Sequence, residues 1–350
     1  MSAARARRTA LAALTAVLSL LLGACGAFGD RPAPGSAPAG TLRIGLPTGV
    51  TSFANADVAV ADAKGFFARE GLQVQVQNLR SGVSVVQGVV GGALDIGAAS
   101  IEPVLNAAAG GGNVAIIGSY ADRLTVSAVT PSSIRTAADL RGRRVGVQEV
   151  GAFREVMSRL VLETGGLTPS DVQYVPVDAQ NYASALLDGR IQSAILQVEQ
   201  AVDAMRTNPD LRVLVDLNQI EPEWHYGTYF TARGWLDANR DTATRFMAAI
   251  TEAHRFMYDN RAETVQIVAR ATEFSPEVID AAYETLLQQQ AVFPVNTGLD
   301  RARISATIAE TQRLGALQST PPPLDRLIDD GPVRAAVDRL GERTGDSRWR

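Results

Sequence analysis

The feature that most constrains the fold is a change of pattern near residue 232. Before this point, short runs of Val, Ile and Leu alternate with segments whose apolar residues recur at helical spacing; after it, every patterned segment is helical. Strands that alternate with helices predict parallel sheets built from βαβ units. Several runs are almost wholly apolar, which predicts strands buried on both faces. Roughly 300 residues make up this patterned part, a length typical of two domains of about 150 residues each.

The predicted strands are residues 42–46, 72–78, 94–98, 114–120, 124–130, 144–148, 172–177, 193–197, 212–217 and 227–232. The predicted helices are residues 56–69, 83–90, 153–164, 179–187, 198–206, 237–260, 262–271, 276–290, 301–314 and 333–343. Ser275 before Pro276 is a typical helix start, with Ser at the N-cap and Pro at the first helical position. Gly71 suits the left-handed residue that ends a helix. The sequence contains no evident internal repeat.

The start of the chain has the order of a secretory signal peptide. A basic stretch at residues 5–8 precedes an apolar run at residues 10–22, which ends in Leu22-Gly23-Ala24-Cys25. A membrane-spanning helix needs about 20 apolar residues, and this run is shorter. The Leu-Gly-Ala-Cys tetrad resembles the lipobox of bacterial lipoproteins, in which the chain is cut before the cysteine and that cysteine receives acyl chains. The resemblance predicts a signal peptide at residues 1–24 and a lipid such as palmitate on Cys25.

Cys25 is the only cysteine, so its modification would leave the mature chain without a thiol. Disulfides, thiolate metal sites and cysteine nucleophiles are then excluded. His225 and His254 are the only histidines, too few for a histidine-rich metal site, and we expect neither a metal nor a cofactor. The formal net charge of −4 argues against a nucleic-acid partner. Residues 25–40, rich in Gly, Ala, Pro and Ser, predict a flexible linker between the lipid and the folded part.

Residues 61–120 carry three motifs in order. They are Lys64-Gly65-Phe66-Phe67, Glu70-Gly71-Leu72 and Gly92-Ala93-Leu94-Asp95-Ile96-Gly97. This order closely resembles the substrate-binding proteins of nitrate-, sulfonate- and taurine-type ABC importers, which are related to the pyrimidine-binding NMT1/THI5-like proteins. The likeness continues through residues 138–151 and 185–196, although Gln192 and Ser193 displace the Asp that is usual in the second segment.

The resemblance implies an α/β architecture, the type II periplasmic-binding fold. In that fold two α/β lobes are joined by two crossing strands, and the C-terminal third is helical. The crossings are expected near residues 124–130 and 227–232. Lobe 1 would then comprise residues 41–125 and 227–343, and lobe 2 residues 126–226. Lobes of this kind close around a ligand by bending at a hinge.

The same resemblance implies the function of a solute-binding receptor. Cys25 would hold the chain at the outer face of the cell membrane, outside the cytoplasm. The chain would capture a small organic or oxyanionic solute of the sulfonate, taurine or nitrate class and deliver it to an ABC permease. Its partners would be the solute, the permease and the membrane lipid, and it would act as a monomer. A ligand sensor that reports to a signalling partner is an alternative with the same fold.

An enzyme is the less favoured alternative. The sequence has no Gly-x-Ser-x-Gly elbow, no His-Glu-x-x-His motif and no P-loop, so we expect no catalytic residues. The pyrimidine synthases related to this family carry a cysteine-rich motif that the chain lacks. Gly110-Gly111-Gly112 precedes a predicted strand, whereas a dinucleotide-binding glycine loop follows one.

The position of the ligand follows from the predicted sheets. Ligands of open parallel sheets bind beyond the carboxyl ends of the strands, beside helix N-termini, which selects the loops at residues 47–55, 99–102, 149–153 and 197–200. The residues expected to contact the ligand are Thr48, Thr51, Ser52, Ser100, Tyr120, Gly151, Ala152, Phe153, Gln197, Glu199 and Tyr226. Free amides near Gly151 and Ala152, at a helix start, would suit an anion.

Several of these residues could have a structural role instead of contacting the ligand. A Ser or Thr hydroxyl at a helix start, such as that of Ser100, caps its own helix as readily as it binds a ligand. Phe153 suits either stacking on an organic ligand or packing in the core. Trp224-His225-Tyr226 suits either an aromatic wall of the cleft or the packing of the hinge.

Carboxylates near the expected cleft bear on the charge of the ligand. Glu102, Glu149 and Glu199 all lie in or beside the selected loops. They would repel a purely anionic ligand unless an arginine such as Arg154 neutralises the site. The sequence leaves the sign of the ligand's charge open.

Overall fold

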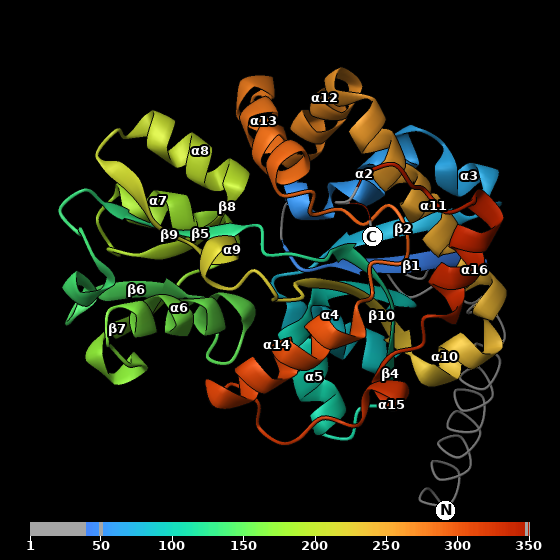
Figure 1. The fold of residues 1–350 in the computed structure, drawn as a ribbon, viewed down its shortest axis with the longest axis horizontal. Helices are drawn as coiled ribbons and strands as arrows, with labels where there is room; N and C mark the ends of the chain where they lie inside the picture. The colour runs from blue at the N-terminus through green and yellow to red at the C-terminus, as the bar shows by residue number, and fades with distance from the viewer. Residues whose placement is uncertain (1–39, 49–51, 347–348, 350) are drawn as a thin grey trace, which may run out of the picture. The chain divides into compact units, whose positions relative to one another are not determined.

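The computed structural model describes residues 40–48, 52–346 and 349. The predicted signal peptide, Cys25, nearly all of the linker and Thr51 lie outside the described residues. The described part forms two α/β lobes and a series of C-terminal helices (Figure 1). This arrangement confirms the predicted fold class.

The first sheet has the strand order β2-β1-β3-β10-β4. Its strands are β1 (Thr41–Leu46), β2 (Gln73–Asn78), β3 (Ile96–Ser100), β4 (Val114–Ala121) and β10 (Gly227–Ala232). β1 pairs in parallel with β2 and β3, whereas β10 is antiparallel to both β3 and β4. Every residue of β3 and β4 is buried, as predicted for strands covered on both faces.

The helices of the first lobe follow its strands. They are the 3-10 turn η1 (Phe53–Asn55), α2 (Ala56–Ala63), α3 (Phe66–Arg69), α4 (Gly82–Val90) and α5 (Ile101–Ala109). The single helix predicted over residues 56–69 is divided because Gly65 adopts a left-handed φ of 68°. Gly71 has a φ of 65°, which confirms its predicted role after a helix. The predicted helix start at Ser100 is confirmed by α5, but the pattern does not give the bounds of this helix, because its apolar residues run on from β3 without a break.

The second sheet combines the parallel pair β6-β7 with the strands β8-β5-β9. Its strands are β5 (Val126–Pro131), β6 (Arg144–Val147), β7 (Gln173–Pro176), β8 (Ala194–Gln197) and β9 (Leu211–Asp216). A parallel bridge between Val145 and Ser193 joins β6 to the start of β8, which makes the full order β7-β6-β8-β5-β9. The associated helices are α6 (Phe153–Thr164), α7 (Tyr182–Leu187), α8 (Val198–Thr207) and α9 (Leu217–Ile220), with 3-10 turns η2 (Ala137–Leu140), η3 (Pro169–Asp171) and η4 (Ala179–Asn181).

The two sheets share one topology that the sequence does not reveal. In each, the second strand of the lobe lies at the edge, next to the first and then the third, and the fourth lies at the other edge. Between the third and fourth strands lies an antiparallel strand that enters directly after a crossing from the other lobe. This inserted strand is β10 in the first sheet and β5 in the second.

Past β10 the chain is helical, as predicted. The helices are α10 (Arg233–Ala238), α11 (Arg240–Asp259), α12 (Arg261–Thr272), α13 (Pro276–Tyr283), α14 (Arg301–Arg313), α15 (Leu324–Leu327) and α16 (Gly331–Leu340), and the π-helix η5 (Glu284–Gln289) continues α13. The Ser275 hydroxyl accepts a hydrogen bond from the Val278 amide, which confirms the predicted N-cap. α11 packs on α2 and α16, whereas α13 contacts α8 of the second lobe.

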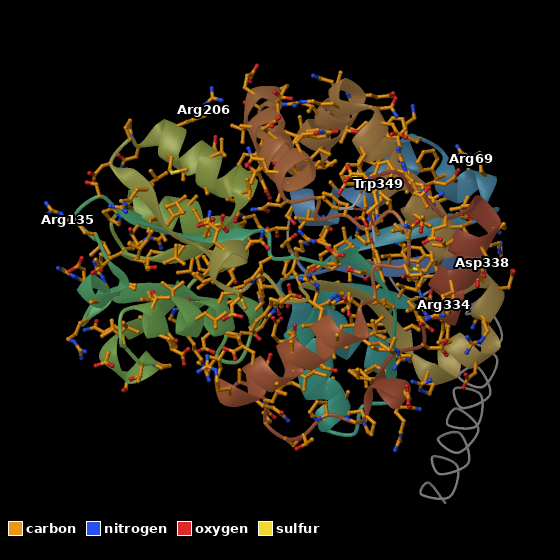
Figure 2. All side chains as sticks on the ribbon, viewed as in Figure 1. Arg69, Arg135, Arg206, Arg334, Asp338 and Trp349 are labelled. Atoms are coloured by element: carbon orange, nitrogen blue, oxygen red, sulfur yellow. The ribbon has the colours of Figure 1, made fainter. Side chains whose placement is uncertain are left out.

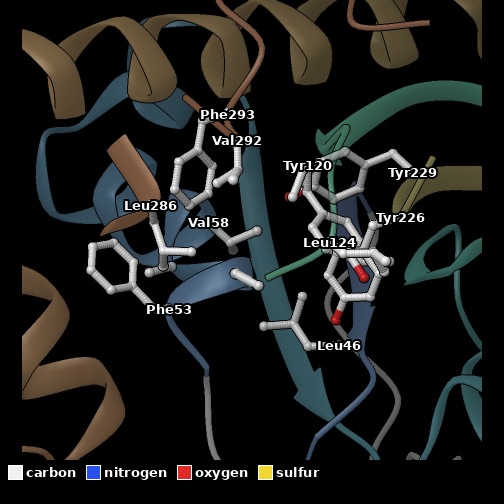
Figure 3. Packing of buried hydrophobic residues seen from close by; sticks show 14 of the residues in the cluster. Leu46, Phe53, Val58, Tyr120, Leu124, Tyr226, Tyr229, Leu286, Val292 and Phe293 are labelled. Atoms are coloured by element: carbon white, nitrogen blue, oxygen red, sulfur yellow. The ribbon is translucent and has the colours of Figure 1, made fainter. Parts of the chain in front are cut away.

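Aromatic side chains form much of the first lobe's core. Figure 3 shows Phe53 beside Phe293 in one group and Tyr120, Tyr226 and Tyr229 together in another. Each such ring is almost completely buried. Burying a side chain of this size stabilises the fold by about 1.5–3 kcal/mol. The two groups therefore hold the neighbouring segments of the first lobe rigidly in place.

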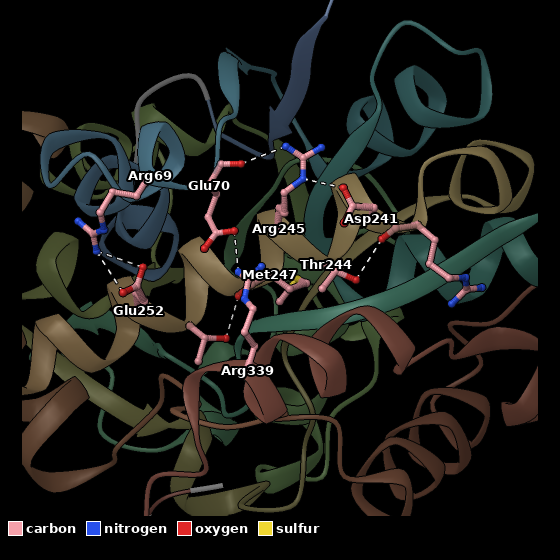
Figure 4. Close-up of polar contacts among 10 residues, drawn as sticks. Arg69, Glu70, Asp241, Thr244, Arg245, Met247, Glu252 and Arg339 are labelled. Atoms are coloured by element: carbon pink, nitrogen blue, oxygen red, sulfur yellow. Dashed lines mark hydrogen bonds and ion pairs between the residues drawn. The ribbon is translucent and has the colours of Figure 1, made fainter.

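Polar contacts attach the C-terminal helices to α3. Figure 4 shows Arg69 with Glu252 of α11, and Glu70 with both Arg245 of α11 and Arg339 of α16. The Arg339–Glu70 pair is the shortest of these, at 2.6 Å. Other charged side chains, such as Arg135 and Arg206, project outward from the surface (Figure 2).

Candidate functional site

A cavity lies at the boundary of the two lobes, beyond the carboxyl ends of β1, β3, β6 and β8. It is small, with about 40 Å³ of room for a water-sized molecule. Its lining residues are Pro47, Thr48, Ser52, Asn55, Gly82, Ser100, Tyr120, Gln148, Phe153, Arg154, Gln197 and Tyr226. All four loops selected from the sequence reach it or lie beside it, which agrees with the rule for ligand positions in open parallel sheets.

Most of the expected ligand residues meet at this cavity. Those that line it are Thr48, Ser52, Ser100, Tyr120, Phe153, Gln197 and Tyr226. Gly151 lines a separate groove on the other side of its loop, and the buried Ala152 and Glu199 lie behind the lining. Pro47, Asn55, Gly82 and Gln148 also line the cavity, and no sequence pattern marks them individually, because short loop residues of mixed type carry none. Contact of the predicted residues with a ligand stays a prediction.

The amides expected to hold an anion are not free. The Gly151 amide donates to Glu155 Oε2 at 2.9 Å, and the Ala152 amide donates to the Glu149 carbonyl oxygen at 3.2 Å. The prediction that these amides are available is therefore wrong, because the first turn of α6 supplies its own carboxylate. Ser100 stands at the N-cap of α5 but makes no side-chain capping hydrogen bond.

Aromatic rings from both lobes meet in the cavity wall. The Phe153 ring, at the start of α6, lies 4.6 Å from the Tyr226 ring centroid to centroid. Tyr226 also makes an edge contact of 5.6 Å with Tyr120 of β4. Trp224 and His225 are completely buried and do not line the cavity, so they pack the region of the second crossing, whereas Tyr226 belongs to the wall.

Gln197 is held in one orientation. Its side-chain Nε2 donates to the Tyr226 hydroxyl at 2.9 Å, and its Oε1 accepts from the Thr125 hydroxyl at 2.6 Å. Its backbone amide donates to Gln200 Oε1, which is part of a capping box at the start of α8. Both ends of this amide are thus occupied within the protein, and burial raises the pKa of Tyr226.

Two polar atoms in the lining have no hydrogen-bond partner. They are Asn55 Nδ2 and the Tyr120 hydroxyl, on side chains that are 1% and 0% exposed. Burial and the nearby Tyr226 raise the pKa of Tyr120 well above its usual value, so it stays protonated. A buried polar atom without a partner costs about 1–3 kcal/mol. Asn55 and Tyr226 lie close enough to the Tyr120 hydroxyl to affect its pKa, so the two unpartnered atoms face each other across the lining.

Buried carboxyl groups lie behind the lining. Glu102 Oε1 accepts a hydrogen bond from Trp224 Nε1 at 3.0 Å, and burial raises the pKa of Glu102 to about 7. Glu199 Oε1 accepts from the Phe53 amide at 3.1 Å, and burial raises its pKa as well. The second oxygen of each group has no partner.

Arg154 is the charged residue of the lining. Its guanidinium donates to the Ile195 carbonyl oxygen and lies 4.7 Å from the centroid of the Tyr182 ring. Its Nη2 is 3.5 Å from Gln200 Oε1. The side chain is 3% exposed, so the arginine is fixed by lobe 2 itself.

Further hydrogen bonds join the lobes around the cavity. Gln148 Nε2 donates to the Arg80 carbonyl oxygen at 3.0 Å, and Glu149 accepts from Ser81 at 3.4 Å. Arg159 Nη1 of α6 donates to the Leu314 carbonyl oxygen at 2.7 Å. The described residues contain no cluster of His, Cys, Asp and Glu suited to a metal ion. Within the same residues, no helix has the length and apolar character needed to span a membrane.

Comparisons with known proteins identify the relatives of this chain. A family model described as NMT1/THI5 like matches residues 53–264, more than half of the chain. A Brucella abortus (strain 2308) protein named as a binding protein is 26% identical over 215 residues, which cover 61% of this chain. The match spans 66% of that relative, just under two thirds of its length.

Solved structures share the fold. The alkanesulfonate-binding protein SsuA from Xanthomonas axonopodis pv. citri, bound to MOPS, matches with a TM-score of 0.67 at 20% identity, over 86% of this chain and 99% of that one. The periplasmic nitrate-binding protein NrtA from Synechocystis PCC 6803 matches with a TM-score of 0.71 at 16% identity, over 87% and 90%. At such identities the likeness shows the fold alone.

A shorter match bears on catalysis. The 4-amino-5-hydroxymethyl-2-methylpyrimidine phosphate synthase of Schizosaccharomyces pombe is 26% identical over 152 residues, 43% of each chain. This covers too little of either protein to indicate a shared activity. The Brucella, Xanthomonas and Synechocystis proteins described above, which match over a larger share of this chain, are named for binding.

Proposed function

The chain belongs to the NMT1/THI5-like family, and on this premise we propose that it is a lipid-anchored, extracytoplasmic receptor of an ABC importer. It captures a small organic or oxyanionic solute in the cavity between the lobes and delivers it to a permease in the membrane. The observation that carries the proposal is a polar and aromatic cavity whose lining comes from both lobes.

A cavity lined by both lobes couples the binding of a solute to the closure of the lobes. Phe153 and Gln197 come from lobe 2, whereas Ser52 and Asn55 come from lobe 1. A solute that touches both sets contacts all of them only when the lobes are together, and it therefore stabilises the closed state. A permease that recognises the closed state then receives loaded receptors in preference to empty ones.

The lipid anchor is supported by the signal-peptide pattern and the tetrad that ends in Cys25. Cys25→Ser should release the protein into the soluble fraction and abolish palmitate labelling, while solute affinity stays unchanged. Fractionation after labelling with palmitate measures both effects. Full retention of the variant in the membrane fraction would contradict the anchor but not the receptor.

The solute-binding function is tested by identifying what the protein holds. Mass spectrometry of the protein purified from its native membrane should reveal a small solute in unchanged form. A thermal-shift screen over sulfonates, nitrate, bicarbonate, pyrimidines and aromatic acids then compares classes. A solute at one hundred times its dissociation constant stabilises by about 2.7 kcal/mol. Absence of any bound or stabilising solute would sink the proposal, and chemical conversion of the solute would favour an enzyme.

Transport and sensing are separated in cells. Deletion of the gene should abolish uptake of the identified solute if the chain serves an importer. Uptake that continues while a transcriptional response to the solute is lost would favour the sensor.

A further inference from the structure

A groove lies on the first lobe at the edge of its sheet that is opposite to the cavity. It has about 460 Å³ of room for water-sized molecules, more than ten times the room in the cavity between the lobes. Its lining comes from the end of α5, the glycine loop before β4, the start of α10 and the segment around α15. α10 and α15 both contact β4 there (Figure 1). We call it the distal groove.

The distal groove lies at the edge of the sheet where the described chain begins. β4 starts at Val114, in the lining of the groove, and β1 starts at Thr41, directly after Gly40. The two strands run in the same direction, because β1 is parallel to β3 and β10 is antiparallel to both β3 and β4. In the order β1-β3-β10-β4, three strand spacings, about 14 Å, separate β1 from β4. Both strand starts therefore share one edge.

The lipid proposed on Cys25 would hold this edge near the membrane. A linker with the composition of residues 25–40 spans about 20 Å on average. Such a tether keeps the groups at the edge of the sheet close to lipid headgroups and so raises the effective concentration of headgroups around them. The inference below rests on this proposed anchor.

Two arginines from distant parts of the chain line the distal groove. Arg233 Nη2 donates to the Arg326 carbonyl oxygen at 2.6 Å, which holds the two residues side by side. The Arg326 side chain is exposed, and within the described part of the chain it makes no hydrogen bond and no ion pair. Arg233 has one loose ionic contact, with 4.0 Å between Nη1 and Asp329 Oδ2. Both guanidinium groups therefore keep donors for a ligand.

The charge around the distal groove is positive. Asp325 also lines the groove, but its Oδ1 accepts from Arg301 Nη1 at 2.7 Å. Asp329, beside Arg233, pairs with Arg240 at 2.7 Å. These two carboxylates are thus balanced by two arginines outside the lining, and the charges of the two lining arginines remain.

The glycine loop keeps the distal groove open. Gly111 has a φ of 89°, which favours glycine, and a Cβ atom at Gly112 would lie 2.8 Å from the Ala107 carbonyl oxygen. The Gly111 and Gly112 amides donate to the Ala108 and Ala107 carbonyl oxygens, so the loop offers room but not its amides. The donors for a ligand are the two guanidinium groups and the exposed side-chain amide of Asn113.

We propose that the distal groove binds the phosphate headgroup of an anionic phospholipid. Guanidinium groups present several N–H donors in a geometry that matches phosphate oxygens, and basic residues near a membrane are attracted to anionic lipids. Bound in this way, the receptor would have its cavity at the far edge of the first sheet, away from the bilayer and open to solute. The groove would thus orient the anchored receptor while it awaits a solute.

Chemical modification of arginine tests this contact in the full-length protein. The lipidated protein is reconstituted in phosphatidylcholine vesicles that contain increasing fractions of phosphatidylglycerol, treated with phenylglyoxal and analysed by mass spectrometry. Phosphatidylglycerol should slow the modification of Arg326 about fivefold or more. Arg135 is exposed on lobe 2 (Figure 2) and is the internal control, whose modification should not change. An Arg326 rate that does not depend on phosphatidylglycerol would overturn the proposal.

Two substitutions with opposite expected effects test the cause. Arg233→Gln should raise the fraction of phosphatidylglycerol needed for half-protection of Arg326 about fivefold. Asp325→Asn removes an exposed carboxylate from the lining and should lower that fraction. Arg135→Gln changes the net charge by the same amount as Arg233→Gln and should have no effect. Equal effects of the two arginine substitutions would show attraction by net charge alone and would overturn the assigned groove.

Inorganic phosphate distinguishes a lipid from a soluble anion. Phosphate added to phosphatidylcholine vesicles should protect Arg326 much less than phosphatidylglycerol does. Equal protection would show that the groove takes free phosphate and would overturn the assignment to the membrane.

Failure of this inference is distinguishable from failure of the proposed function. Palmitate labelling reports on the anchor, and mass spectrometry of the bound solute reports on the receptor. The modification assay can also be run with vesicles added to the protein from outside, so it tests the groove even if Cys25 carries no lipid.

Discussion

Glu199 of lobe 2 accepts a hydrogen bond from the amide of Phe53 of lobe 1, with 3.1 Å between Oε1 and the nitrogen. Both residues are buried. The bond crosses the lobe boundary beside the cavity, so one carboxyl group contributes both to the contact of the lobes and to the charge near the ligand.

This bond predicts a difference between two substitutions of Glu199. Glu199→Ala leaves the buried Phe53 amide without an acceptor and should destabilise the fold by about 1–3 kcal/mol. Glu199→Gln keeps an oxygen at that position and should cost less. Urea denaturation of the two variants measures the difference, and equal losses would show that the amide finds another acceptor.

Glu102 should make stability depend on pH. Burial raises its pKa from 4.5 to about 7, so the folded state holds this proton more tightly than the unfolded chain does. The protonated carboxyl group of Glu102 therefore contributes to the free energy of unfolding at low pH, and this contribution is lost as the pH rises from about 4.5 to about 7. The difference between the two pKa values corresponds to about 3 kcal/mol.

The measurement compares wild type with Glu102→Gln, which cannot titrate. Relative to the variant, the wild-type free energy of unfolding should fall across that pH range. The same comparison with Glu277→Gln should show no such fall, because hydrogen bonds to Ser275 and to its own backbone amide lower the pKa of Glu277. Parallel profiles for wild type and Glu102→Gln would contradict the assignment.

Phe153 should matter more for affinity than for stability. Its ring stands at the cavity against Tyr226 and is only partly buried. Phe153→Ala should weaken binding of the native solute about tenfold, the equivalent of about 1.4 kcal/mol of aromatic contact. Phe274→Ala removes an equally half-buried ring elsewhere and should leave affinity unchanged. Equal affinities of the two variants for the solute would show that Phe153 does not contact it.

Gly227 is required by the packing of Tyr120. A Cβ atom at this position would lie 2.2 Å from the Tyr120 ring, so Gly227→Ala must displace that ring. Overpacking of this kind costs about 1–3 kcal/mol. Gly234→Ala is the control: nothing lies within 4 Å of its Cβ position in α10, and alanine should stabilise the helix by about 0.5–1 kcal/mol. Thermal unfolding that ranks the two variants in the opposite order would contradict this account.

The sequence predicts the strands well because most are short runs rich in apolar residues, and β2 alternates Gln with Val as a half-exposed strand does. β10 and α6 have their predicted bounds, residues 227–232 and 153–164. The loops of the cavity also follow from the sequence, because the carboxyl ends of strands mark them. Contacts that depend on rotamers do not follow. Nothing local shows that Asn55 would lack a partner.

The role of Glu155 is only partly visible in the sequence. Glu155 stands at the third position of α6, where glutamate commonly turns back to cap the amides before the helix. A glutamate at this position indicates that an amide just before the helix has an acceptor, and in the structure that amide is Gly151, one residue before the N-cap Ala152. The complete burial of Glu155 depends on packing between distant segments, so no local sequence pattern predicts it.

The inserted strands impose an order on folding. β5 lies between β8 and β9 in lobe 2, whose strands all come from one uninterrupted stretch, Val126–Asp216, so this sheet can assemble as soon as that stretch exists. The first sheet cannot do so, because β10 lies between β3 and β4 and appears more than one hundred residues after β4. During synthesis, which starts at the N-terminus, β4 must therefore stay without its partner β10 until lobe 2 has been made. The first sheet begins earliest but is completed last, and a chaperone that shields exposed strand edges would be needed most during that interval.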